Sequence, residues 1–218
     1  MHFDYNGEDK NMKNNFDSNC TLQTKEIRAI YDEKTIRVYQ AYNKRIADEA
    51  IKLGTFGQLF NMDRMTWIKT SFLWMMYRSG WAQKDGQERI LAIDIKREGF
   101  EKILENAVLS SFEKDIYVSY EEWQARLKIS EVRCQWDPDR DIHGNPLNRR
   151  AIQLGLKGSM VENYVNKWIV KITDITEDVD ILKKAKDNKS LDIKALPDEK
   201  EYFVSDNIRD ILGIRQDS

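Results

Sequence analysis

The sequence contains few cysteines, histidines and prolines, and each shortage excludes a class of protein. Its 218 residues include 2 cysteines, 2 histidines and 3 prolines. Cys20 and Cys134 lack the close spacing of a zinc or redox motif, so we expect two unlinked thiols in a reducing compartment and no metal site. His2 lies in the N-terminal tail, which leaves His143 as the one candidate catalytic imidazole. Three prolines argue against long linkers between domains.

The sequence also lacks a long apolar run and an excess of one charge. No run of about 18 or more apolar residues and no signal peptide is present, which indicates neither a membrane protein nor a secreted one. We therefore expect a cytoplasmic protein. The 35 Lys and Arg against 37 Asp and Glu give a net charge of −2, unlike many dedicated nucleic-acid-binding proteins. Any anion-binding site must be local.

The composition predicts one well-filled core. Hydrophobic residues make up 41% of the chain and aromatic residues 11%. Residues 1–20 are rich in Asn, Asp and Lys and are predicted to be a disordered tail. We expect residues 21–218 to form a single α+β domain, in which helices flank a mixed or antiparallel sheet.

Local patterns predict the main strands and helices. Residues 27–31 and 35–42 are expected to form a hairpin, and strands are expected at 89–95, 131–136 and 150–156. Asn43 and Gly54 have the residue types of a helix N-cap and C-cap. Capping-box pairs at Ser119 with Glu122 and at Ser159 with Glu162 predict two further helices, the second of them continuing to Ile172.

The segment from Arg64 to Trp81 holds three tryptophans and three cations. Its apolar run from about Met65 to Tyr77 predicts a buried helix that ends at Gly80. One face of that helix would carry residues four, three and four positions apart, namely Trp67, Ser71, Trp74 and Arg78. A planar ring could then stack on indole while a phosphate meets Arg64, Lys69 or Arg78. The alternative is a core helix whose charged ends point outward.

Gln40 places an amide on the apolar face of the strand 35–42. Strict alternation puts it beside Val38 and Tyr42. Leaving a buried amide unpaired costs about 1–3 kcal/mol. Gln40 therefore either joins a structural network or binds a ligand.

The segment 132–156 is predicted as a strand, a long polar loop and a second strand, with the loop acting as a lid or binding loop. Five of its polar residues are candidate contacts for a substrate or nucleic acid: Arg133, Gln135, Arg140, Arg149 and Arg150. Asp137, Asp139 and Asp141 alternate as in a calcium loop, but the glycine and glutamate of an EF-hand do not follow. A solvated turn is expected here, and a divalent-metal site is the alternative.

Three segments resemble the family called domain of unknown function 4291. They are Val38–Tyr42, Arg64–Trp81, and Gln135–Pro138 together with Arg150–Leu156. The similarity spans roughly residues 25–205, and the family has no established activity to transfer. Thr70 stands where we expect proline, a difference that concerns the entry to the predicted helix.

A second resemblance is to the ADP-ribosyltransferase-like fold, and it lies in Val38–Tyr42, Ala47–Ile51 and Gly54–Phe56. It implies that NAD is bound and that Gln40 hydrogen-bonds the adenosine ribose. The aromatic residues available to stack on nicotinamide are Trp67, Trp74 and Tyr77. Gln153 lies on a late strand, where a catalytic glutamate is expected. Glutamine can hydrogen-bond a hydroxyl but brings no charge.

Two functional hypotheses follow. The first is a nucleotide (NAD)-binding enzyme of ADP-ribosyltransferase-like type that acts on a nucleotide or nucleic acid. It assigns catalysis to Gln153 and cofactor binding to Gln40, Arg64, Trp67, Lys69, Trp74, Tyr77 and Arg78. The second is a non-catalytic module that binds RNA or single-stranded DNA through the same tryptophans and arginines.

Overall fold

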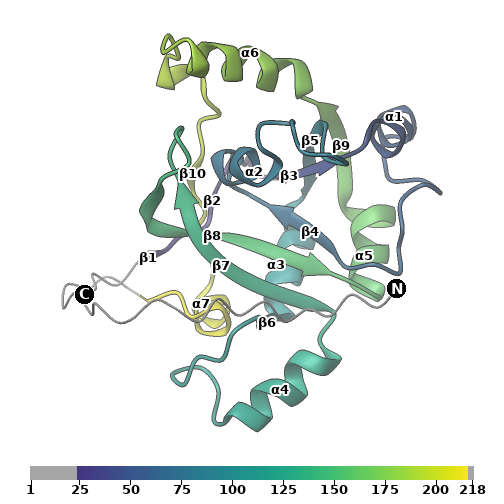
Figure 1. The fold of residues 1–218 in the computed structure, drawn as a ribbon. Coiled ribbons are helices and arrows are strands. Elements are labelled where there is room, and N and C mark those ends of the chain that lie inside the picture. Colours follow the sequence, from purple (N-terminus) through teal and green to yellow (C-terminus); the bar gives the residue numbers. More distant parts are fainter. Residues whose placement is uncertain (1–23, 216–218) are drawn as a thin grey trace, which may run out of the picture.

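A mixed sheet forms the centre of the computed structural model, which describes residues 24–215 (Figure 1). Its strand order is β6-β7-β8-β4-β3-β5-β9, and β1 pairs with β8. The pairs β6–β7 and β1–β8 are parallel, whereas the other pairs of this sheet are antiparallel. The strands are β1 (Thr24–Lys25), β3 (Thr35–Tyr42), β4 (Thr66–Lys69), β5 (Arg89–Lys96), β6 (Ala107–Leu109), β7 (Val132–Arg140), β8 (Pro146–Leu156) and β9 (Ile169–Asp174). The predicted α+β domain with a mixed sheet is confirmed.

Helices lie on both faces of this sheet. They are α1 (Lys44–Leu53), α2 (Phe72–Ser79), α3 (Arg97–Glu105), α4 (Tyr120–Ile129), α5 (Ser159–Asn163), α6 (Thr176–Asp187) and α7 (Asp206–Leu212). Side chains of α1, α3, α5 and α7 join the main core, which includes Val38. The next residue, Tyr39, points to the other face and packs with α2 and α6 in a smaller cluster.

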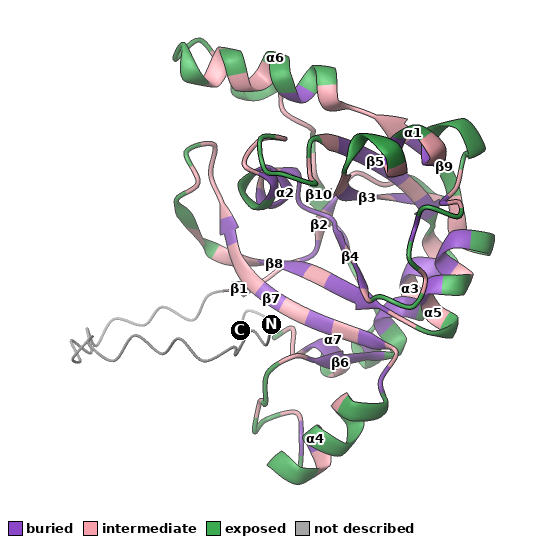
Figure 2. Cartoon of the chain, turned by 45° about the vertical axis from the view of Figure 1, so that its right-hand side comes forward, coloured by how far each residue is buried: buried purple, intermediate pink, exposed green. Residues whose placement is uncertain are grey.

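Strands β7 and β8 leave part of that second face open. In β7, buried residues such as Cys134 alternate with half-buried ones such as Gln135, and Figure 2 shows this alternation along the ribbon. Helix α2 reaches this face at Asp139, through a hydrogen bond from Ser71. A polar strip of sheet surface therefore continues from the edge of α2 along β7 and β8.

Several predicted elements are confirmed together with their caps. Asn43 accepts a hydrogen bond from the Ile46 amide, and Gly54 ends α1 in the left-handed conformation. Ser119 caps α4 by accepting from the Glu122 amide. Strands β5, β7 and β8 lie where they are expected, and β7 and β8 extend further into the intervening segment.

The helix predicted from about Met65 to Tyr77 is wrong in its first half. Residues 66–69 form the strand β4, which pairs with β8 along its length. Ser71 then caps α2 by accepting from the Trp74 amide, and Gly80 ends the helix as predicted. The run is continuously apolar because β4 is central and largely buried, so it cannot be distinguished from a helix by periodicity.

The helix predicted from Ser159 to Ile172 is also too long. Helix α5 passes into a π-helical turn at Tyr164–Trp168, and the β-branched residues that follow form β9 against β5. The capping box is absent, because the Ser159 hydroxyl bonds to Glu131 instead.

The predicted hairpin at residues 27–42 is reduced to one bridge, Tyr31 with Ile36. Strand β2 (Arg28–Ala29) pairs instead with β10 (Lys200–Glu201), and a short 3₁₀ turn, η2 (Ile193–Ala195), precedes β10. The predicted tail at residues 1–20, with His2 and Cys20, lies outside the described residues. Within 24–215, every helix is too short or too polar to cross a membrane.

Candidate functional site

Strands β3 and β4 share one residue pair, Tyr39 with Lys69. Strand β3 pairs with β5 along its full length, and β4 pairs with β8 along its full length. The sheet is therefore continuous on both sides of the β3–β4 boundary and opens at that boundary. Beyond this single pair, the side chain of Gln40 forms hydrogen bonds to β4 where backbone hydrogen bonds between the two strands would otherwise lie. Its Nε2 lies 3.3 Å from the Trp67 carbonyl oxygen and 2.7 Å from the Thr66 hydroxyl. We call this opening the β3–β4 seam.

Gln40 belongs to a buried polar network. The Tyr164 hydroxyl donates to its Oε1 at 2.7 Å, and the Tyr42 hydroxyl lies 2.8 Å from its Nε2. Burial raises the pKa of both tyrosines, so both are neutral donors and acceptors. Of the two alternatives for Gln40, the structural network is therefore present, and the amide also lines a cavity.

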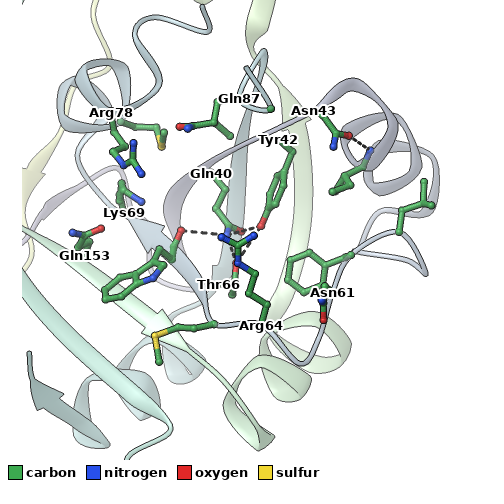
Figure 3. Close-up of a pocket in the computed structure, with 18 of the residues that line it drawn as sticks. Gln40, Tyr42, Asn43, Asn61, Arg64, Thr66, Lys69, Arg78, Gln87 and Gln153 are labelled. Carbon is green, nitrogen blue, oxygen red and sulfur yellow. Dashed lines mark hydrogen bonds between the residues drawn. The ribbon is translucent and has the colours of Figure 1, made fainter. Parts of the chain in front are cut away.

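That cavity, of about 640 Å³, lies over the seam (Figure 3). Residues of β3, β4, α2 and two loops line it. Six of the predicted site residues meet there: Gln40, Arg64, Trp67, Lys69, Arg78 and Gln153. In Figure 3, Lys69, Arg78 and Gln153 lie together on one side of Gln40, and Arg64 lies on another.

Lys69 is the most unusual group in the cavity. It is 6% exposed and forms no hydrogen bond or ion pair with any described residue. The pKa of its ammonium group is lowered to about 8, mainly by burial and also by the nearby Arg78, while Asp137 opposes the shift. Buried lysines normally have an acidic partner.

Two further cations line the cavity. The guanidinium groups of Arg64 and Arg78 are in exposed residues and have no hydrogen-bond partner within residues 24–215. One acid, Asp85, lies among the lining residues. The cavity is therefore cationic, although the protein as a whole is slightly acidic.

Trp67 lies against β8 because residue 155 is glycine. A Cβ atom on Gly155 would come within 3.0 Å of two indole carbons and 2.7 Å of the Met65 sulfur. These are closer than packed carbon atoms can approach. The glycine thus lets the Trp67 indole, which is partly exposed, lie on the sheet at the edge of the cavity.

Gln153 is paired with Lys69 across the β4–β8 ladder and contacts an acid. Its Nε2 donates to Oδ2 of Asp137 at 2.6 Å, while Gln135 Nε2 donates to Oδ1 at 2.9 Å. Asp137 forms no ion pair with any residue that the structure describes. The predicted catalytic glutamine is thus a hydrogen-bond donor to a carboxylate.

Trp74 and Tyr77 do not line the cavity, and the proposed common helix face with Trp67 is wrong, since Trp67 lies on a strand. The rings of Trp74 and Tyr77 stack with centroids 5.4 Å apart. The Arg140 guanidinium lies 4.1 Å from the centre of the Tyr77 ring. Trp74 is 7% exposed, as expected for the core alternative.

The predicted contacts on β7 and β8 are largely engaged within the protein. Arg149 pairs with the buried Asp139 at 2.8 Å, and Arg150 donates to the Trp136 carbonyl oxygen. Arg133 is half-buried, and its Nε has no hydrogen-bond partner in the part of the chain that the structure describes. None of these five residues, Arg133, Gln135, Arg140, Arg149 and Arg150, lines the cavity.

The expected long loop is a short turn, because β7 and β8 leave only residues 141–145 between them. Asp141 accepts from the amides of His143 and Asn145 in this turn. The solvated turn predicted for three aspartates is thus confirmed for Asp141 and wrong for Asp137 and Asp139, which lie on β7. In the part of the chain described, no cluster of three or more potential metal ligands occurs.

Sequence reasoning missed several groups of the site. Thr66 and Tyr164 hold Gln40, and no local pattern places either of them beside it. The sequence indicates Asp137 only as a possible calcium ligand. Its alternation with Gln135 predicts a common face, but the contact with Gln153 depends on the β7–β8 register.

The comparisons with known proteins agree with the first resemblance. A search of curated proteins found no match. A family model described as Domain of unknown function (DUF4291) matches residues 26–202, which include the seam, the cavity residues and both glutamines that hold Asp137. The match covers most of the chain, and the chain therefore belongs to this family.

Proposed function

We propose that this protein is a nucleotide-binding enzyme of ADP-ribosyltransferase-like type, which binds NAD over the β3–β4 seam and acts on a nucleotide or nucleic acid. The observation that carries the proposal is Lys69, a buried lysine that lines a cavity and forms no ion pair with any described residue. A charge in this position is stabilised when a ligand brings the anion. The pyrophosphate of NAD supplies such a group.

The other lining residues support a nucleotide over a simple anion. A cavity of about 640 Å³ has the size of typical small-molecule sites. Trp67 offers an indole for a planar ring, as in base–aromatic stacking. The guanidinium groups of Arg64 and Arg78, which have no hydrogen-bond partner among the described residues, suit phosphate oxygens. NAD would be consumed here as a substrate.

The alternative, a non-catalytic RNA or single-stranded DNA module, has less support. Its stacking residues would include Trp74, which is buried, and its cations would include Arg149 and Arg150, which are bonded within the protein. Of the groups that this alternative uses, those of the cavity remain available, but the cavity suits a single nucleotide better than a strand of nucleic acid.

Thermal-shift measurements with NAD, ATP, ADP and short oligonucleotides test the proposal, because a ligand that binds only the folded state raises the melting temperature. We expect NAD and ADP to stabilise the wild-type protein, and Lys69→Met to abolish the shift. Stabilisation by oligonucleotides alone would favour the nucleic-acid module. No shift with any nucleotide would contradict the proposal.

A further inference from the structure

The predicted catalytic residue of the cavity, Gln153, carries no charge, so the proposed reaction still needs a negatively charged group. Cleavage of the bond between ribose and nicotinamide develops positive charge on the ribose, and a fixed negative group lowers that barrier most. We propose that Asp137 is the catalytic carboxylate of this site and that Gln135 and Gln153 are positioning residues that hold it. This inference rests on the proposed NAD binding.

The geometry fixes the Asp137 carboxylate in one orientation. Gln135 and Gln153 face each other across the β7–β8 ladder, and each donates an amide hydrogen to a different oxygen of Asp137. Each oxygen keeps a lone pair for a further partner. Gln153 also lines the cavity, so this carboxylate is one side chain away from the cavity wall.

Asp137 forms no ion pair within residues 24–215, and its charge acts on the nearby ammonium group of Lys69. Asp139, two residues later, is buried, forms an ion pair with Arg149 and accepts from Ser71. Asp137 instead receives two neutral amides, and no described residue forms an ion pair with it. It is half-buried and lies on the same face of the sheet as Gln135 and Gln153. A carboxylate that two neutral donors hold in place, and that no ion pair engages, is an arrangement suited to electrostatic catalysis.

The reaction balances without another reagent. The bond between C1′ of the ribose and the nicotinamide nitrogen breaks, and its electron pair leaves with nicotinamide. The Asp137 carboxylate faces the positive charge that develops at C1′. An acceptor hydroxyl forms the new bond to C1′, and its proton passes to Asp137 and then to solvent.

Asp137→Asn tests the assignment, since it keeps the shape and removes the charge. The ligands are NAD, ADP, and an ADP compound whose terminal ribose is replaced by a protonated pyrrolidine, which mimics the cationic ribose. We expect Asp137→Asn to bind ADP within about twofold of wild type, to bind the cationic compound about tenfold more weakly, and to release nicotinamide about 100-fold more slowly.

Asp85→Asn is the matched comparison, because Asp85 is the acid that lines the cavity rim. If Asp85→Asn loses affinity for the cationic compound and Asp137→Asn does not, the assignment is overturned. Equal affinities and rates in wild type and Asp137→Asn also overturn it, as does a wild-type protein that binds NAD and releases no nicotinamide. A wild-type protein that binds neither NAD nor ADP contradicts the proposed function itself.

Gln135→Met tests the positioning role, because Gln135 holds Asp137 without lining the cavity. We expect kcat to fall about tenfold while KM stays unchanged, since the lost hydrogen bond orients the carboxylate and does not bind NAD. An unchanged kcat, or a KM that rises in step with a fall in stability, would contradict this role.

Discussion

The Tyr164 hydroxyl donates a 2.7 Å hydrogen bond to Gln40, 124 positions earlier in the chain. This bond joins the π-helical turn to a strand residue that bridges the β3–β4 seam. Both residues are buried, so loss of the bond is costly.

Gln40→Ala should therefore lower stability as well as ligand affinity. The Tyr164 hydroxyl would lose its amide partner, and an unpaired buried group costs about 1–3 kcal/mol, whereas the Thr66 hydroxyl would keep its hydrogen bond to Tyr42. Urea denaturation measures the loss, and Gln124→Ala on the exposed face of α4 is the control. Weaker NAD binding at unchanged stability would show that Gln40 acts on the ligand alone.

Lys69→Met should stabilise the protein at pH 7 while it abolishes nucleotide binding. The folded-state pKa of about 8 lies below the usual 10.5, so folding disfavours the charged form. This penalty, up to about 3 kcal/mol, is fully present below pH 8. It is relieved as the pH rises from about 8 to 10.5, where the unfolded chain binds more protons.

The advantage of Lys69→Met over wild type should consequently shrink across that pH range. Denaturant unfolding at pH 7, 8.5 and 10 measures it, with the exposed Lys52→Met as control. A stability difference that does not change with pH would contradict a buried, unpaired ammonium group.

Arg78→Ala should weaken ADP binding more than tenfold and leave the melting temperature nearly unchanged. The exposed guanidinium has no hydrogen-bond partner in the described residues, whereas a charge-assisted contact with phosphate is worth about 1.5–3 kcal/mol. Arg78→Lys should rescue the affinity in part, because a lysine cannot bind phosphate through two parallel hydrogen bonds. Calorimetric titration decides, and equal affinities in mutant and wild type would remove Arg78 from the site.

Gly155→Ala should displace the Trp67 indole without touching a polar group of the cavity. The added Cβ would lie 2.7 Å from the Met65 sulfur and 3.0 Å from the indole, so both side chains must move. We expect a changed tryptophan fluorescence spectrum and NAD affinity about tenfold lower. Ala151→Gly, on the same strand, is the control, and unchanged NAD affinity would show that Trp67 does not stack on the ligand.

The sequence predicted the elements whose ends carry local signals. Asn43 and Gly54 delimit α1, and Ser119 begins α4, because caps act within one turn of the helix. It failed where the signal is non-local. Residues 66–69 are a strand because β3 and β8 flank them, and nothing within the segment itself records that pairing.

The sequence predicted many residues of the site but not their arrangement in space. Cations and Trp67 in the Arg64–Trp81 segment do line one cavity, but a strand and a helix present them instead of a single helix face. Gln153 lies at the cavity because it is paired with Lys69 across the β4–β8 ladder. Asp137 lies next to the cavity because Gln153 donates a hydrogen bond to it. These contacts depend on strand register, which residue types alone do not determine.

The single pair between β3 and β4 divides the sheet into two panels, β9-β5-β3 and β4-β8-β7-β6, each with its own complete backbone pairing. A change in the angle between the panels alters the width of the cavity while the ladders within each panel stay intact. The opening between them is held by the side chains of Gln40, Thr66, Tyr42 and Tyr164. The backbone contributes only one residue pair across this opening, so side chains supply most of the hydrogen bonds that hold the two panels together there.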